Sequence, residues 1–271
     1  MVPPVSPVHA RYRFRAGRLA PLDAIHPAET RVLVADSWLV DEGATLALPL
    51  HLSRFREAVT ARSPDLAEEL EAFLRAVIEK LPAESAWFPR IELVEGGEGQ
   101  FFLYRERRAP DRHSSVRLAT FGGPEPRRHP TVKGPDFERL MAARTAVQAL
   151  GADEAVILSS DGVVIEGAYS ALLWWRGDTL CVPALDLLRV DSVTARSIIA
   201  LATARGMDVS YESVVPAELD GHEVWAASAL HGIRIATRWI DGPSLAERPG
   251  RLSAWRAALD KLSRPIVTLG A

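Results

Sequence analysis

The stretch KGPDFERLMAARTAVQALGADEAVILSSDGVVIEG, residues 133–167, decides the fold. It predicts a helix over residues 137–150 that ends at Gly151, since glycine is favoured just past a helix C-terminus. A strand follows over residues 154–159, then a Ser-Asp-Gly turn, then a second strand over residues 163–166. A helix followed directly by a pair of strands is typical of an α/β chain.

Elements of both kinds continue on either side of this stretch. Strands are expected over residues 31–40, 87–93, 100–105, 171–175, 208–215, 223–227 and 233–240, and helices over 51–62, 63–81, 192–205 and 252–262. Between them, residues 120–130 (TFGGPEPRRHP) contain two glycines and three prolines, which sustain neither a helix nor a central strand. We therefore expect a small N-terminal α/β domain over residues 1–124 and a C-terminal α/β domain over residues 125–271.

The composition excludes several classes of protein. The 271 residues include 32 basic and 35 acidic ones, so the net charge of −3 argues against a nucleic-acid binder or a protein held on membranes by charge. A single cysteine, Cys181, excludes an internal disulfide, and no group of His, Asp and Glu shows the spacing of metal ligands. The chain shows no secretory signal and no apolar run near the ~20 residues of a membrane span. We expect a cytoplasmic protein without a bound metal.

Lysine is rare, so few residues can carry lysine chemistry. Only Lys80, Lys133 and Lys261 occur. Lys80 and Lys261 lie on charged faces of predicted helices, where a solvated charge is the ordinary interpretation. Lys133 lies in the extended segment HPTVKGP, residues 129–135, between two prolines. Taken alone, a loop lysine is also more often a solvated charge than a reactive amine.

Other residues allow a plain interpretation beside a chemical one. Residues 191–194, Asp-Ser-Val-Thr, enter a predicted helix, where they form an ordinary cap or hold a phosphate through free N–H groups. Glu166 ends a strand, where a solvated acid is usual, and Ser228 follows another strand, where it could begin a turn. His51 and Arg54 lie three residues apart and therefore share one helical face.

In their order along the chain, these features resemble the class IV (fold type IV) pyridoxal-phosphate enzymes. That family includes branched-chain aminotransferases, D-amino-acid aminotransferases and 4-amino-4-deoxychorismate lyases. In that family a lysine is followed by a helix and then by the motif Gly-x-Asp-Glu-Ala. Two strands come next, joined by an Asp-x-Gly turn, and the second strand leads to a glutamate. Matching positions here are Lys133, 152–155 (Ala-Asp-Glu-Ala), Asp161-Gly162 and Glu166.

The resemblance extends over residues 31–60 and 130–242. Residues 51–55 (HLSRF) are similar to the family's His-x-x-Arg-Leu, and residues 181–183 (CVP) to a strand ending in Thr-Pro. Residues 192–194 (SVT) are similar to a Gly-Ile-Thr phosphate turn, and residues 227–229 (ASA) to a second phosphate-side turn.

The resemblance implies a fold and a set of roles. The fold would have a small N-terminal domain and a larger C-terminal domain with a barrel-like sheet. Lys133 would form the internal aldimine with pyridoxal 5′-phosphate and later move a proton. Glu166 would face the pyridine nitrogen, and Arg54 would hold the phosphate. The remaining phosphate contacts would come from Ser192, Val193, Thr194, Ser228 and Ala229.

Some positions depart from the family pattern, and these bear on the reaction. Ala171 replaces the Asn that follows the glutamate loop, and the phosphate turn carries Ser192 in place of Gly and Ala195 in place of Arg. Branched-chain aminotransferases carry a tyrosine where this chain has Glu138. Asp136 is a near substitute for the Asn of the lyases and D-amino-acid aminotransferases.

We therefore expect a lyase that converts 4-amino-4-deoxychorismate to 4-aminobenzoate and pyruvate. By resemblance, a hydroxyl from the N-terminal domain protonates the departing enolpyruvate, and Ser37 occupies that position unless it is an ordinary strand residue. Arg105 and Arg107 are candidates to bind the carboxylates of a small anionic amine substrate; the plain interpretation is that they are exposed basic residues near a hairpin. The alternatives are amino transfer between D- or branched-chain amino acids and 2-oxo acids, and a non-catalytic family member. The resemblance also implies a homodimer.

Overall fold

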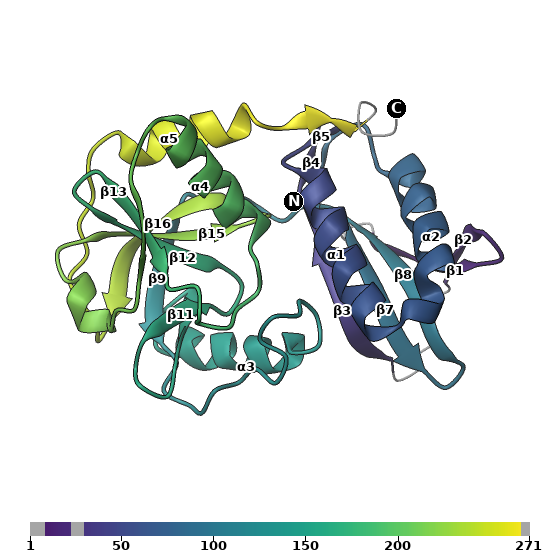
Figure 1. The fold of residues 1–271 in the computed structure, drawn as a ribbon, viewed down its shortest axis with the longest axis horizontal. Coiled ribbons are helices and arrows are strands. Elements are labelled where there is room, and N and C mark those ends of the chain that lie inside the picture. The colour runs from purple at the N-terminus through teal and green to yellow at the C-terminus, as the bar shows by residue number, and fades with distance from the viewer. Residues whose placement is uncertain (1–8, 23–29, 267–271) are drawn as a thin grey trace, which may run out of the picture. The chain divides into compact units, whose positions relative to one another are not determined.

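The first part of the fold is a five-stranded antiparallel sheet centred on one hairpin. In this computed structural model, which describes residues 9–22 and 30–266, the hairpin joins β7 (Arg90–Gly96) to β8 (Gly99–Arg107). The strand order is β2-β1-β8-β7-β3, with β1 at His9–Arg15, β2 at Arg18–Pro21 and β3 at Arg31–Ser37. Helices α1 (Leu48–Arg62) and α2 (Ala67–Lys80) pack on this sheet (Figure 1).

Aromatic packing holds these helices to the sheet. Phe55 of α1, Phe73 of α2 and Phe102 of β8 are fully buried, and the Phe73 and Phe102 rings stack with centroids 4.9 Å apart. A short four-stranded sheet, β17-β5-β4-β6, lies in the same unit, with β4 at Val40–Asp41, β5 at Ala44–Thr45, β6 at Ala86–Trp87 and β17 at Arg264–Pro265. The first unit thus comprises the described residues 9–22, 30–111, 133–135 and 263–266.

The second unit, residues 112–132 and 136–262, is built on an eight-stranded mixed sheet. The sheet has the order β11-β10-β9-β16-β15-β12-β13-β14 and curls into a half-barrel (Figure 1). Its strands are β9 (Ser115–Thr120), β10 (Glu154–Leu158), β11 (Val164–Gly167), β12 (Ala171–Arg176), β13 (Thr179–Pro183), β14 (Val209–Glu212), β15 (Glu223–Ser228) and β16 (Gly232–Ile240). Helix α3 (Phe137–Gln148) packs on β10, α4 (Val193–Ala204) on β14 and β15, and α5 (Arg251–Asp260) on β16.

The predicted α/β class and the barrel-like sheet are confirmed, but the boundary between the two units differs from the prediction. The sequence predicts the boundary after residue 124, whereas the units divide between Asp111 and Arg112. The reason is β9, which pairs with β10 and β16 and so already belongs to the second sheet before the proline-rich segment begins.

Local chemistry also explains where two helices begin. Helix α1 begins at Leu48, three residues before the expected start, because Pro49 is well suited to a first helical turn. Ser63 does not cap the next helix; its hydroxyl donates a 2.6 Å hydrogen bond to Gln100 Oε1. A 3₁₀ turn over Pro64–Leu66 therefore precedes α2.

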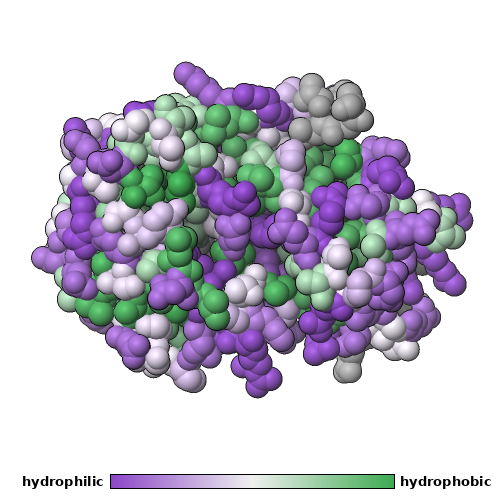
Figure 2. Space-filling view, in the orientation of Figure 1, coloured by the Kyte–Doolittle hydropathy of each residue, from purple (hydrophilic) through white to green (hydrophobic). Residues whose placement is uncertain are grey.

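Hydrophilic side chains cover most of the face drawn in Figure 2, and hydrophobic ones form separate patches. None of the helices within the described residues has the length and apolarity needed to cross a membrane.

Candidate active site

The segment carrying Lys133 adds to the edge of the five-stranded sheet. Residues 133–135 belong to the first unit, and the backbone N–H of Ala35 in edge strand β3 donates a 2.7 Å hydrogen bond to the Lys133 carbonyl oxygen. Gly134 has a φ of 127°, and a Cβ there would lie 2.8 Å from the Ala35 nitrogen. Only glycine allows this approach without strain, so the backbone fixes the position of Lys133 along β3.

Replacing Gly134 with alanine is expected to lower the free energy of unfolding by roughly 3 kcal/mol, because strained φ and a backbone clash add together. Chemical denaturation measures this loss. Gly17→Ala is the matched control: Gly17 has a φ of 76°, but a Cβ added there would meet nothing within 4 Å. That control should lose only about 1 kcal/mol from the backbone conformation. Equal losses in the two variants would contradict the close approach at Gly134.

A buried carboxylate, Asp36, organises the side chains beside Lys133. Arg54 forks onto it, with Nε to Oδ2 and Nη2 to Oδ1 both at 2.8 Å. His51 Nδ1 lies 2.8 Å from Oδ1. Burial alone would raise the pKa of Asp36, but the charges of Arg54, His51 and Lys133 outweigh it and hold that pKa well below its usual range. Asp36 is therefore ionised and fixes the guanidinium of Arg54.

Lys133 has an unusually acidic ammonium group for a lysine. Burial of the amine lowers its pKa to about 8, and the positive charges of Arg54, Arg90 and Arg107 add to that effect while Asp36 opposes it. Part of the Lys133 population is consequently unprotonated at neutral pH, which is the form that acts as a nucleophile.

The face of the sheet that carries Ser37 also carries arginines. Ser37 of β3 pairs in register with Arg90 of β7, which pairs with Arg105 of β8. Arg105 donates a 2.6 Å hydrogen bond to buried Glu92. Among the described residues, neither the buried Ser37 hydroxyl nor Arg107 Nη2 has a hydrogen-bond partner. Burial, with Arg90 nearby, lowers the pKa of Arg107 to about 10. This face has polar groups to offer an anion.

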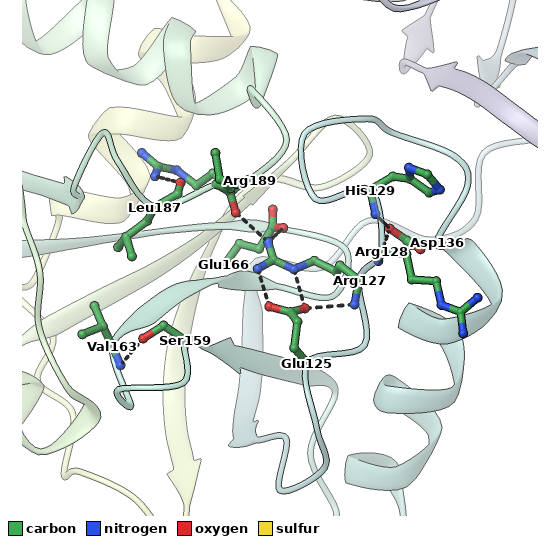
Figure 3. Close-up of polar contacts among 11 residues, drawn as sticks. Glu125, Arg127, Arg128, His129, Asp136, Ser159, Val163, Glu166, Leu187 and Arg189 are labelled. Atoms are coloured by element: carbon green, nitrogen blue, oxygen red, sulfur yellow. Dashed lines mark hydrogen bonds and ion pairs between the residues drawn. The ribbon is translucent and has the colours of Figure 1, made fainter. Parts of the chain in front are cut away.

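In the second unit, Glu166 of β11 is buried against an arginine. Arg127 Nη1 donates a 2.5 Å hydrogen bond to Glu166 Oε1 (Figure 3). Burial raises the pKa of Glu166 to about 7 despite this contact. Neither Asp36 nor Arg127 was among the residues predicted from the sequence to take part in the site.

The other predicted residues of the second unit lie at a helix start and a strand end. Ser192 caps α4, and its Oγ accepts a 3.3 Å hydrogen bond from Ala195 N. Val193 and Thr194 are the first helical residues, so their N–H groups have no partner within the helix. Ser228 ends β15, and its Oγ accepts a 3.3 Å hydrogen bond from the backbone N–H of His231.

A pocket of about 150 Å³ lies in the second unit beside the start of α4. Its lining is largely apolar and includes Ile165, the residue before Glu166, together with Val190 and Ser192. Two of its large lining side chains, Leu185 and Tyr211, are exposed.

Most of the chain matches one family of known proteins. A family profile described as "Amino-transferase class IV" matches residues 33–239. The chain belongs to the class IV aminotransferase family. It is accordingly an enzyme of a family that depends on pyridoxal phosphate and has aminotransferase or lyase activity.

Solved structures of aminotransferases and of a putative lyase share the fold. A branched-chain aminotransferase from Thermoproteus uzoniensis with norvaline is 18% identical, with a TM-score of 0.78, and the match covers 95% of this chain and 99% of that one. A hypothetical aminotransferase from Mycobacterium tuberculosis in its PLP-bound form is 17% identical, with a TM-score of 0.74 over 94% of this chain and 98% of that one. A putative 4-amino-4-deoxychorismate lyase from Legionella pneumophila is 15% identical, with a TM-score of 0.71 over 87% and 91%. No curated protein sequence matches this member of the family significantly.

Proposed function

We propose that this enzyme is a lyase that converts 4-amino-4-deoxychorismate to 4-aminobenzoate and pyruvate. The observation that carries the proposal is the buried Ser37 hydroxyl, which has no hydrogen-bond partner among the described residues and shares a sheet face with Arg105 and Arg107. The substrate carries an amine and two carboxylates. Loss of its enolpyruvate group requires a proton donor, which a hydroxyl can provide, and two arginines beside that hydroxyl can bind the carboxylates.

The residues present fit pyridoxal phosphate. Lys133, with its lowered pKa, would bind the cofactor covalently, and Arg54, held by Asp36, would pair with its phosphate. Backbone N–H groups of Val193 and Thr194 would add to the phosphate contacts, as would Ser192, Ser228 and Ala229. Glu166 would accept a hydrogen bond from the N–H of the pyridine ring. When bound, the cofactor supplies an electron sink for negative charge that develops on the substrate.

The chain's own side chains would then handle the protons. Lys133, as the unprotonated amine, would remove a ring proton from the substrate. Ser37 would donate a proton to the departing enolpyruvate. Arg105 and Arg107 would bind the carboxylates through charge-assisted hydrogen bonds, and Arg107 Nη2 is a donor for which the described part of the chain provides no partner.

The test supplies 4-amino-4-deoxychorismate to the enzyme with pyridoxal phosphate and measures pyruvate and 4-aminobenzoate. The proposal predicts equal amounts of both products. A parallel assay supplies glutamate with several 2-oxo acids. Product in the second assay alone would eliminate the lyase and favour amino transfer, for which the same arginine-bearing face could bind the carboxylates of amino and 2-oxo acids.

Ser37→Ala is expected to lower kcat of the lyase reaction by about 10²-fold, because a positioned proton donor contributes roughly 10²–10⁴-fold. Steady-state kinetics at constant pH give kcat and KM separately. The matched control is Ser53→Ala, since the Ser53 hydroxyl bonds to Glu57 on the exposed side of α1. A Ser37→Ala enzyme with unchanged kcat would remove Ser37 from the reaction.

The rate at which apoenzyme takes up pyridoxal phosphate is expected to rise with pH and to reach half of its maximum near pH 8. The reason is that only the unprotonated Lys133 attacks the aldehyde, and burial lowers its pKa to about 8. Absorbance of the bound cofactor follows the reaction. A midpoint near 10.5, the ordinary value for lysine, would show that the attacking amine is not Lys133 with its lowered pKa.

We also propose that the enzyme is a homodimer, as the family resemblance implies. Light scattering during size-exclusion chromatography should give a mass of twice 29.6 kDa. A mass of one chain at micromolar concentration would rule out a stable dimer.

A further inference from the structure

Arg127 is a buried arginine in an otherwise irregular segment. It lies between β9 and α3, in the proline- and glycine-rich residues 120–130, and only 3% of its side chain is exposed. A buried guanidinium needs partners for its donors and for its charge. Those partners show what the residue is for.

Each side of the guanidinium contacts a different segment of the second unit. Nη1 donates to Glu166 Oε1 at 2.5 Å and to the carbonyl oxygen of Leu188 at 3.0 Å. Nε and Nη2 donate to the two carboxylate oxygens of Glu125 at 2.8 and 2.7 Å. Figure 3 shows Arg127 at the centre of these contacts. The side chain thus connects its own segment, strand β11 and the loop that leads to α4.

Of the charges that act on Glu166, Arg127 is the one in direct contact. Arg189 also acts on Glu166, but its guanidinium donates to the carbonyl oxygens of Pro183, Ala184 and Leu187. The third charge, Glu125, is negative and partly exposed, and it opposes ionisation of Glu166. Ionisation of Glu166 therefore depends chiefly on Arg127.

We propose that Arg127 is a positioning residue that keeps Glu166 ionised and orients its carboxylate toward the ring nitrogen of the cofactor. This inference rests on the proposed role of Glu166. A protonated carboxyl would present an O–H donor and could not serve as the negative acceptor of a pyridinium N–H. With Oε1 held by Arg127, Oε2 is left as the oxygen that turns to the ring.

The pKa of Glu166 fits this role. Burial raises it to about 7 even with the Arg127 charge in place. Removing that charge raises the pKa further, so Glu166 would be mostly protonated at neutral pH. Removing the opposing charge of Glu125 would lower the pKa instead.

The test measures the affinity of the apoenzyme for pyridoxamine 5′-phosphate as a function of pH. This probe carries the same ring and phosphate but forms no bond to Lys133. For Arg127→Gln we expect at least a ten-fold weaker affinity at pH 7. This is the value of one charged hydrogen bond, here the bond between ionised Glu166 and the ring N–H of the probe. Affinity falls at low pH, and we also expect the midpoint of this fall to move up by one pH unit or more. Arg127→Lys should recover part of both effects.

Two variants separate a charge effect from a structural one. Arg128→Gln makes the same chemical change at an exposed neighbour, whose backbone N–H still bonds to Asp136, and should leave affinity and midpoint unchanged. Glu125→Gln keeps Arg127 and should move the midpoint down, so the proposal stays testable even if Arg127→Gln does not fold. An unmoved midpoint in Arg127→Gln, or an upward shift in Glu125→Gln, would overturn the inference.

The Glu166→Gln background separates this inference from the proposed function. There, Arg127→Gln should cause no further shift in pH midpoint, because the group that titrates is gone. If Glu166→Gln itself leaves probe affinity unchanged, the proposed contact of Glu166 with the ring fails, and the inference fails with it. If Glu166→Gln weakens binding but Arg127→Gln does not, only the role of Arg127 is wrong.

Discussion

Lys133→Ala is expected to abolish covalent uptake of pyridoxal phosphate and to lower activity by about 10³-fold or more. The substitution removes both the nucleophile and the proton carrier, and a positioned acid–base group alone contributes roughly 10²–10⁴-fold. Stability should not fall. The lowered pKa of Lys133 means that folding buries a charge at a cost, so its removal is expected to leave the free energy of unfolding unchanged or to raise it.

This combination distinguishes a reactive lysine from a structural one. Lys261→Ala is the control, because Lys261 is exposed at the end of α5. It should keep full activity and normal cofactor uptake. A Lys133→Ala enzyme that still attached the cofactor covalently, or that unfolded with its activity loss, would contradict the assignment.

Asp36→Ala is expected to lower the free energy of unfolding by about 3–5 kcal/mol, the cost of leaving a buried ion pair with one partner. Asp36 is fully buried, and its removal leaves Arg54 without its bidentate acceptor. Affinity for pyridoxal phosphate should also fall, since the guanidinium that the phosphate would meet loses both of the hydrogen bonds that orient it on Asp36. Chemical denaturation and cofactor titration measure the two losses.

The control is an exposed pair of the same geometry. Arg117 forks onto Asp153 at 3.0 and 2.8 Å, and both side chains are about half exposed. Asp153→Ala should therefore cost no more than about 1 kcal/mol. The sign of the pH dependence adds a check. Because the pKa of Asp36 is depressed in the folded protein, its contribution to the free energy of unfolding is present above about pH 4. That contribution is lost as the pH falls further. Similar losses in both variants would show that Asp36 is not a buried charge partner.

The fold was largely predictable because its elements carry local signals. The alternation and turn residues of 90–107 specify a hairpin, and the Gly151 stop and Ser192 cap specify helix ends. Strand β1 was missed, although Ala10, Tyr12 and Phe14 alternate there with arginines. The arginine content obscured a regular two-residue period.

The site residues that sequence reasoning missed are those whose meaning depends on long-range contacts. Asp36 is the one charged residue between Val32 and Ser37, which is a signal, but its partners lie 15 and 18 positions further on. Arg127 has no local signal, because its importance comes from Glu166, 39 positions away. Residue order pointed to Lys133 and Glu166. Packing in three dimensions showed what holds each of them.

The most direct test of the account uses the scarcity of lysine in this chain. Borohydride reduces the bond between pyridoxal phosphate and the lysine that holds it, which makes the attachment permanent. The protein is then digested, and mass spectrometry determines the masses of the peptides that contain Lys80, Lys133 and Lys261. We expect one cofactor per chain on Lys133 and none on the other two lysines. Label on Lys80 or Lys261 with Lys133 unmodified would contradict this expectation.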